Sequence, residues 1–170
     1  MKPQKIHFII TGGTIDSLYR ATSETAEPNK KSIIPHYIKN VIKPHFAATF
    51  KTICMLDSGD ITDALRHKMV AEIKKTRAKY VIITHGTNTM TKTARFIKRH
   101  LKKAPNKVVV LTGAMVPLKE FALSDGGFNV GMAIGATMSL KPGVYIAMNG
   151  HIFPAGRVKK NFKAARFEKS

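Results

Sequence analysis

The stretch IHFIITGGTIDSLY, residues Ile6–Tyr19, places a short apolar run directly before Thr-Gly-Gly-Thr. A run of this length and composition is typical of a strand that is covered on both faces. Gly12 and Gly13 allow a sharp turn after it, and their amides could face one pocket. The hydroxyl of Thr14 could then attack a carbonyl carbon while adjacent amides hold the oxyanion. A phosphate-binding turn and a plain strand-to-helix turn are the alternatives.

The rest of the chain alternates strand and helix patterns. The predicted strands cover residues 6–10, 48–56, 80–84, 107–112 and 143–149, and the predicted helices cover 32–44, 63–79, 91–102 and 128–140. Such alternation implies a parallel sheet with right-handed crossovers. We therefore predict one domain over residues 1–170 with an α/β fold, an open, mostly parallel, doubly wound (Rossmann-like) sheet in three α/β/α layers. The polar segment 19–35 is predicted to be a mobile loop.

Polar segments that contain glycine or hydroxyl residues follow four of the predicted strands. They are Thr11–Ile15, Asp57–Thr62, Thr84–Met90 and Thr112–Asp125. Ligands of open parallel sheets bind beyond the carboxyl ends of the strands, so these segments are expected to form one site. The segment THGTNTM, Thr84–Met90, gathers three hydroxyls, an imidazole and an amide. One hydroxyl or amide side chain is enough to cap a helix, so the additional polar side chains indicate a functional site.

The composition is strongly basic. Lys and Arg number 29 against 10 Asp and Glu, which gives a net charge of +19. Such an excess attracts polyanions without specificity. The cations are spread along the chain, and no nucleic-acid-binding motif accompanies them. We expect a solvated basic surface with weak nonspecific polyanion binding, and a true nucleic-acid or anionic-membrane partner is the alternative.

Several classes of protein are not favoured. No apolar run approaches the ~18 residues of a membrane span, so no membrane association is predicted. The N-terminus carries no pattern of a secretory signal, and the single Cys54 favours a reducing compartment, so a cytoplasmic location is expected. The seven histidines show no metal-ligand spacing, and the Gly-Gly turn lacks the Lys-Ser/Thr ending of a nucleotide loop. We therefore predict no metal and no cofactor.

Taken together, the motifs resemble those of the bacterial-type L-asparaginases, specifically of their N-terminal domain. The matching segments are TGGTI at 11–15, HGTNTM at 85–90, LTGAMVP at 111–117 and SDGGFN at 124–129. The resemblance runs from about residue 5 to residue 160. It implies an amidohydrolase that uses a threonine nucleophile on a small-molecule amide substrate, asparagine or a related compound.

The same resemblance implies roles for individual residues. Lys160 resembles the lysine paired with the second hydroxyl centre, with Lys159 as its competitor if the register is off by one. The implied catalytic residues are Thr14, Thr87, Asn88, Lys160 and the loop tyrosine Tyr19. The implied substrate-binding residues are Gly13, Asp57, Ser58, Gly86 and Ala114.

Two departures from the family pattern bear on activity. Asn88 stands where the family has aspartate, so the site keeps its shape and loses a charge. We expect free asparagine to bind about tenfold more weakly, and the pKa of Lys160 to fall if it is buried. The chain has 170 residues, about half the usual family length, so the usual C-terminal domain is expected to be absent. By analogy with the family, a homodimer is expected.

Two other functions fit the same residues. The pocket could hold an amino acid or another anion without turnover, as a non-catalytic binding module. The net charge of +19 would also suit an RNA-associated, amidotransferase-like subunit.

Overall fold

A computed structural model describes residues 4–101, 106–119 and 122–170 and confirms the predicted α/β class. Its main sheet has six strands in the order β4 (Ala47–Leu56), β1 (Lys5–Gly12), β5 (Tyr80–Thr84), β6 (Val108–Thr112), β7 (Gly143–Met148) and β8 (His151–Pro154). Only β8 runs antiparallel to its neighbour in this sheet. The chain moves from β1 to one side to form β4 and then returns to the other side to form β5. The switch point between β1 and β5 is where such sheets bind ligands.

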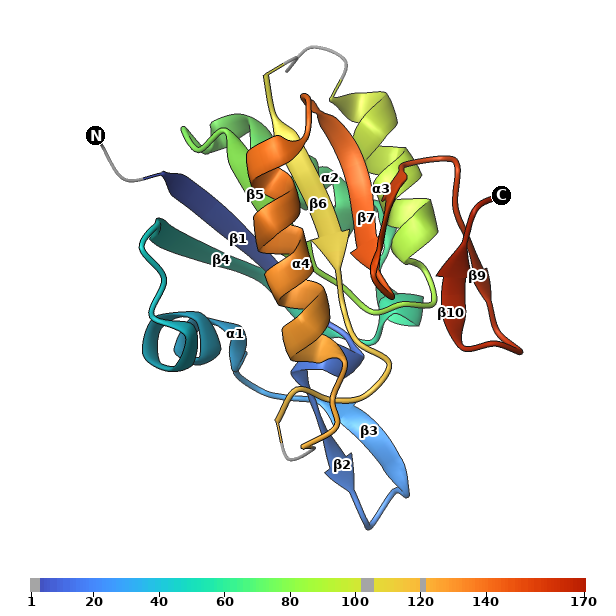
Figure 1. The fold of residues 1–170 in the computed structure, drawn as a ribbon. Coiled ribbons are helices and arrows are strands. Elements are labelled where there is room, and N and C mark those ends of the chain that lie inside the picture. Colours follow the sequence, from blue (N-terminus) through green and yellow to red (C-terminus); the bar gives the residue numbers. More distant parts are fainter. Residues whose placement is uncertain (1–3, 102–105, 120–121) are drawn as a thin grey trace.

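Helices cover both faces of the sheet, which gives the predicted three layers (Figure 1). The helices α2 (Asp63–Lys75) and α3 (Met90–His100) pack on one face, through a core that includes Ile9 of β1. The other face carries α4 (Gly126–Ser139) and α1 (Ile34–His36), whose chain continues as a π-helix over Tyr37–Ile42. Ile6 and Phe8 of β1 belong to that second core. Adjacent strand residues thus serve opposite layers, because side chains alternate across a strand.

The segment 19–35, which was predicted to be a mobile loop, contains regular secondary structure. The chain first makes a 3₁₀ turn over Thr14–Asp16 and then a hairpin of β2 (Ser17–Arg20) and β3 (Thr25–Pro28), which projects beyond the sheet (Figure 1). Most of its side chains are exposed, so neither strand shows the apolar pattern by which strands are recognised. The backbone pairing of the hairpin is what orders this polar segment.

The helix boundaries differ from the prediction at α2, which ends at Lys75 and not at residue 79. Its start is as expected, since the Thr62 hydroxyl accepts a hydrogen bond from the amide of Leu65 at 3.3 Å. At the other end, Lys107 Nζ donates to the carbonyls of Thr76 and Ala78 at 2.6 and 2.7 Å. Lys107, the residue before β6, therefore binds carbonyls of the segment that follows α2.

The C-terminal segment adds structure that the sequence did not predict. After β8, the chain forms a separate hairpin of β9 (Lys159–Asn161) and β10 (Arg166–Glu168) beside α3 (Figure 1). Phe167 of this hairpin is buried in the α2–α3 core. The hairpin is therefore anchored to the domain, and it carries Lys160 to the carboxyl end of the sheet. Within the part of the chain that the structure describes, no helix has the length and apolarity that crossing a membrane requires.

Candidate active site

The loops that follow β1, β4, β5 and β6 meet at the carboxyl end of the sheet, and glycines permit the contact. A Cβ atom added to Gly13 would overlap the backbone of Gly86. One added to Gly86 would lie 2.7 Å from the Cβ of Ser58, and one on Gly113 would overlap the carbonyl oxygen of His85. The four polar segments predicted to converge therefore do so, and hydrogen is the only substituent that fits at these glycines.

The Gly-Gly turn differs in detail from the expected amide pocket. Gly12 and Gly13 both have positive φ, +86° and +77°, which explains the two glycines. However, the Gly13 amide donates to the carbonyl of Leu56 at 2.9 Å. It is therefore engaged within the protein and does not supply an oxyanion donor. The turn fixes Thr14, which is half-buried and begins the 3₁₀ turn.

Lys160 joins the second polar segment from 73 positions away. Its Nζ donates to the hydroxyl of Thr87 and to the side-chain carbonyl of Asn88, both at 2.7 Å. Thr87 is only 5% exposed. Lys159, the competing residue, is exposed and lies opposite Glu168 in the C-terminal hairpin. The structure thus places Lys160, and not Lys159, against Thr87.

The surroundings of Lys160 shift its pKa downward. Burial lowers the pKa of Lys160, and the negative charge of Asp57 opposes this shift without cancelling it. Its polar contact at Asn88 is an amide oxygen, which stabilises the ammonium less than a carboxylate would. A lysine with a lowered pKa is a better general base near neutral pH.

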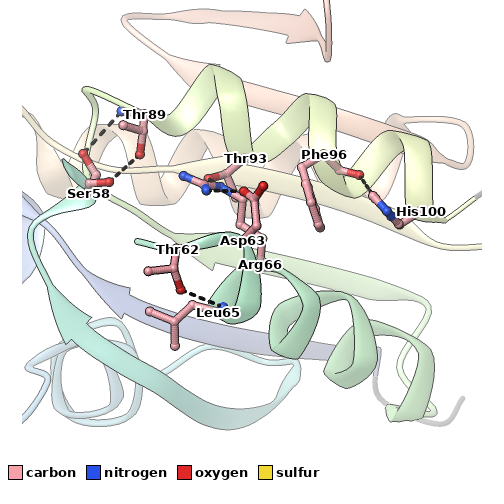
Figure 2. Close-up of polar contacts among 9 residues, drawn as sticks. All are labelled: Ser58, Thr62, Asp63, Leu65, Arg66, Thr89, Thr93, Phe96 and His100. Carbon is pink, nitrogen blue, oxygen red and sulfur yellow. Dashed lines mark hydrogen bonds and ion pairs between the residues drawn. The ribbon is translucent and has the colours of Figure 1, made fainter. Parts of the chain in front are cut away.

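Ser58 is tied to the start of α3 by Thr89, as Figure 2 shows. The Thr89 amide donates to the Ser58 hydroxyl at 3.3 Å, and the Thr89 hydroxyl donates to the Ser58 carbonyl at 2.6 Å. Ser58 is 1% exposed, and its own hydroxyl proton remains available to a ligand. Sequence reasoning counted Thr89 among the hydroxyls of the segment Thr84–Met90 but gave it no role of its own.

His85 is fully buried and forms a hydrogen bond to the backbone. Its Nδ1 donates to the carbonyl of Gly86 at 2.8 Å, while Nε2 has no partner among the described residues. Burial lowers the pKa of His85 to about 4. The imidazole is therefore neutral at working pH, and it holds the Gly86 peptide rather than carrying protons.

The predicted site residues differ in how closely the structure brings them together. The structure brings together Gly13, Ser58, Gly86, Thr87, Asn88 and Lys160. Asp57 is exposed beside them, within electrostatic reach of Lys160. Ala114 is fully buried in the core, so only its backbone is available to a ligand. Tyr19 is 52% exposed on the β2–β3 hairpin, and no hydrogen bond within the described ranges links it to the group.

Asp16, two residues after Thr14, is a buried carboxylate that sequence reasoning missed. Its side chain accepts from the amide of Ile33 at 2.8 Å, and its carbonyl accepts from the amide of Asn29 at 2.9 Å. Both ends of the β2–β3 hairpin are therefore held at Asp16. Its Oδ2 has no partner in the described part of the chain, and burial raises the pKa of Asp16.

The substitution Asp16→Asn is expected to stabilise the protein at neutral and higher pH. Because the folded-state pKa of Asp16 is raised, this carboxyl costs stability as pH rises from the ordinary aspartate range through the raised value. Asparagine keeps an oxygen for the Ile33 amide and carries no charge. Melting curves should show a variant-minus-wild-type difference in Tm that is larger at pH 8 than at pH 4. A difference that is constant with pH would contradict the assignment.

Comparisons with known proteins agree with this geometry. The family model described as Asparaginase, N-terminal, matches residues 5–168. The chain is 32% identical over 162 residues to a glutaminase-asparaginase of Acinetobacter glutaminasificans, covering 89% of this chain and 48% of that protein. It is also 32% identical over 169 residues to a probable periplasmic L-asparaginase of Haemophilus influenzae, covering 94% and 47%.

Solved structures give the same result. The crystal structure of a probable cytoplasmic L-asparaginase from Campylobacter jejuni superposes with a TM-score of 0.80 at 29% identity, covering 98% of this chain and 53% of that one. The L-asparaginase of Thermococcus kodakarensis gives a TM-score of 0.78 at 25% identity, covering 98% and 51%. The chain spans about half the length of the relatives that it matches.

Proposed function

The chain belongs to the asparaginase family, and on that basis we propose that it is an amidohydrolase acting on a small side-chain amide, asparagine or a related compound. The observation that carries the proposal is the contact of Lys160 with Thr87, at 2.7 Å, beside the switch point of the sheet. Thr14 stands at the opposite side of that switch point, since it follows β1 and Thr87 follows β5. In this arrangement, the nucleophilic hydroxyl of Thr14 and the Thr87 hydroxyl, which Lys160 activates, would contact the same substrate.

The proposed reaction has two steps. The Thr14 oxygen attacks the amide carbonyl carbon, the carbon–nitrogen bond breaks, and the nitrogen leaves as ammonia with the threonine proton. Water then attacks the resulting ester and releases the acid, and the Thr14 hydroxyl is restored. Thr87 and Lys160 would move the protons, because the lowered pKa of Lys160 suits it to accept one.

The substrate would be held by the loops after β4 and β5. The Ser58 hydroxyl accepts from Thr89 and can still donate to a substrate carboxylate. Asp57 and Asn88 would meet the substrate ammonium, and the backbones of Gly13, Gly86 and Ala114 would form the walls. For Tyr19, the β2–β3 hairpin would have to bring the ring toward Thr14 after substrate binds.

Ammonia release tests this function. The protein would be incubated with asparagine, glutamine and a panel of N-substituted amides. We expect release from at least one of them, and its loss when Thr14 is replaced. If no substrate yields ammonia, the hydrolase proposal fails.

The substitution Asn88→Asp is expected to lower KM for asparagine by about tenfold. A carboxylate makes a charge-assisted hydrogen bond to the substrate ammonium, which is worth roughly 1.5–3 kcal/mol against about 1 kcal/mol for an amide. The carboxylate would also face Lys160 Nζ, which now lies 2.7 Å from the Asn88 oxygen, and raise the pKa of that lysine. Steady-state kinetics across pH would measure both effects. An unchanged KM would show that residue 88 does not meet the ammonium.

Asn88 favours a second function, because its neutral amide stands where the family has the negatively charged carboxylate of an aspartate. In this alternative the pocket binds a dicarboxylic amino acid and does not hydrolyse it. The alternative predicts that aspartate raises Tm while asparagine yields no ammonia. Product formation in the assay above would exclude it.

Assembly and location are also proposals. A homodimer is supported by α4, whose fourteen residues carry no charge and which exposes Phe128 and Met138. Two copies at +19 each repel one another, and a contact through an uncharged face adds the least local repulsion to that total. Light scattering at physiological salt would detect the dimer.

A cytoplasmic location is supported by the name of the Campylobacter jejuni structure, although the Haemophilus influenzae relative is named periplasmic. Fractionation of cells that express the natural gene would test it.

A further inference from the structure

The helices α3 and α4, which lie on opposite faces of the sheet, differ sharply in charge. Among the eleven residues of α3, Lys92, Arg95, Lys98 and Arg99 are cations and none is an acid. The helix α4 in the opposite layer carries no charged residue. These four cations already stand together in the sequence, within residues 92–99, and the fold places that basic run on one helix.

These cations line a hollow between α3 and the turn that follows β8. The hollow has a volume of about 350 Å³, and its lining residues are Lys92, Arg95, Lys98, Arg99, Ala155 and Gly156. Lys98 Nζ donates to the carbonyl of Ala155 at 3.1 Å, so this lysine joins the two walls. The volume lies within the ~300–1,000 Å³ range of ligand pockets.

The three remaining cations, Lys92, Arg95 and Arg99, form no ion pair in the described part of the chain. The ion pairs there use His7, Arg20, Arg66 and Arg166 as their cations. The acid Asp63 on the neighbouring helix is already bound to Arg66 at 2.7 Å (Figure 2). Asp63 also lies within electrostatic reach of Lys92, whereas Arg95 and Arg99 form no ion pair among the described residues.

The spacing of these cations suits several anionic groups at once. Lys92, Arg95 and Arg99 stand at positions i, i+3 and i+7, so they share one face of α3. They extend over about 10 Å of helix, at about 1.5 Å per residue. The planar guanidinium of arginine can donate hydrogen bonds to two phosphate oxygens at once, and the ammonium of lysine adds a further positive charge.

We propose that this hollow binds linked phosphates, such as those of a nucleic-acid backbone or of a free triphosphate. The site is separate from the amide site and does not depend on hydrolysis. With three cations on single-stranded RNA, affinity should fall about 20-fold between 50 and 200 mM salt. Removing two of the cations should reduce that dependence to about threefold.

The test uses the full chain with two probes, a labelled 12-nucleotide single-stranded RNA in fluorescence anisotropy and inorganic triphosphate in calorimetry. The test variant is Arg95→Gln/Arg99→Gln. The matched control, Lys39→Gln/Lys141→Gln, removes the same charge at exposed positions outside the hollow. We expect the test variant to bind at least tenfold more weakly and the control to change less than twofold, with both retaining the wild-type Tm.

The two probes distinguish the source of the phosphates. Binding of triphosphate alone, with the expected dependence on Arg95 and Arg99, identifies a free anion as the ligand. Tighter binding of the RNA, with the same dependence, identifies a nucleic acid. Equal losses in test and control variants would mean diffuse attraction to a +19 surface and would overturn the proposal. Absence of binding for both probes at ~0.15 M salt would overturn it as well.

Discussion

Replacing Lys160 with methionine is expected to lower kcat for amide hydrolysis by about 10²–10⁴-fold, the range typical of a lost general base. Methionine keeps most of the length of the side chain but cannot accept a proton or donate to Thr87 and Asn88. Because the pKa of Lys160 is lowered, wild-type activity should rise with pH until this lysine is deprotonated. The variant should lack that rise, and stopped assays of ammonia across pH would measure both effects.

Lys159→Met provides the matched control. It removes the same charge from the adjacent residue of β9, and Lys159 is exposed on the other side of the strand. This variant should keep wild-type kcat and the same pH profile. Equal losses in the two variants would mean that total charge, or the stability of the C-terminal hairpin, controls the rate, and Lys160 would have no specific role.

Replacing Thr14 with valine is expected to reduce kcat by about 10⁴-fold or more, because the reaction loses its nucleophile. Valine keeps the β-branched shape of the half-buried side chain, so the 3₁₀ turn and its contacts should remain. Tm should stay close to that of the wild type, which separates lost chemistry from lost folding.

Thr14→Ser is the companion variant, since it keeps a hydroxyl on the same turn. Serine should retain measurable turnover, although the missing methyl group leaves the hydroxyl more rotational freedom. If serine were as inactive as valine while both proteins folded, the hydroxyl of residue 14 would not be sufficient for turnover, and the methyl group of Thr14 would be needed as well. If valine were fully active, the nucleophile would have to be another residue.

The sheet could be predicted from the sequence because several of its strands are continuous apolar runs that can be recognised there. Buried runs such as Ile6–Ile10 and Tyr80–Thr84 are short and rich in β-branched residues, which favours strands over helices. In a parallel sheet, the polar segments that follow such strands lie at one edge. The β2–β3 hairpin escaped prediction because its side chains are mostly exposed on both faces. The β9–β10 hairpin escaped because its strands are three residues each.

The site was less accessible to sequence reasoning. Periodicity and spacing do not join Lys160 to Thr87 across 73 positions, and only the family resemblance predicted that pair. The direction of the Gly13 amide depends on the carbonyl of Leu56, which belongs to another strand. The burial of Asp16 depends on the returning chain at Ile33. Each of these facts requires the tertiary fold, because each joins residues from different elements.

A crystal structure with bound aspartate, the product of asparagine hydrolysis, tests the central proposal most directly. The proposal predicts the side-chain carboxylate of aspartate within hydrogen-bond distance of both the Thr14 and Thr87 hydroxyls, with its α-carboxylate on Ser58. Aspartate bound elsewhere, or either hydroxyl directed away from the ligand, would contradict it.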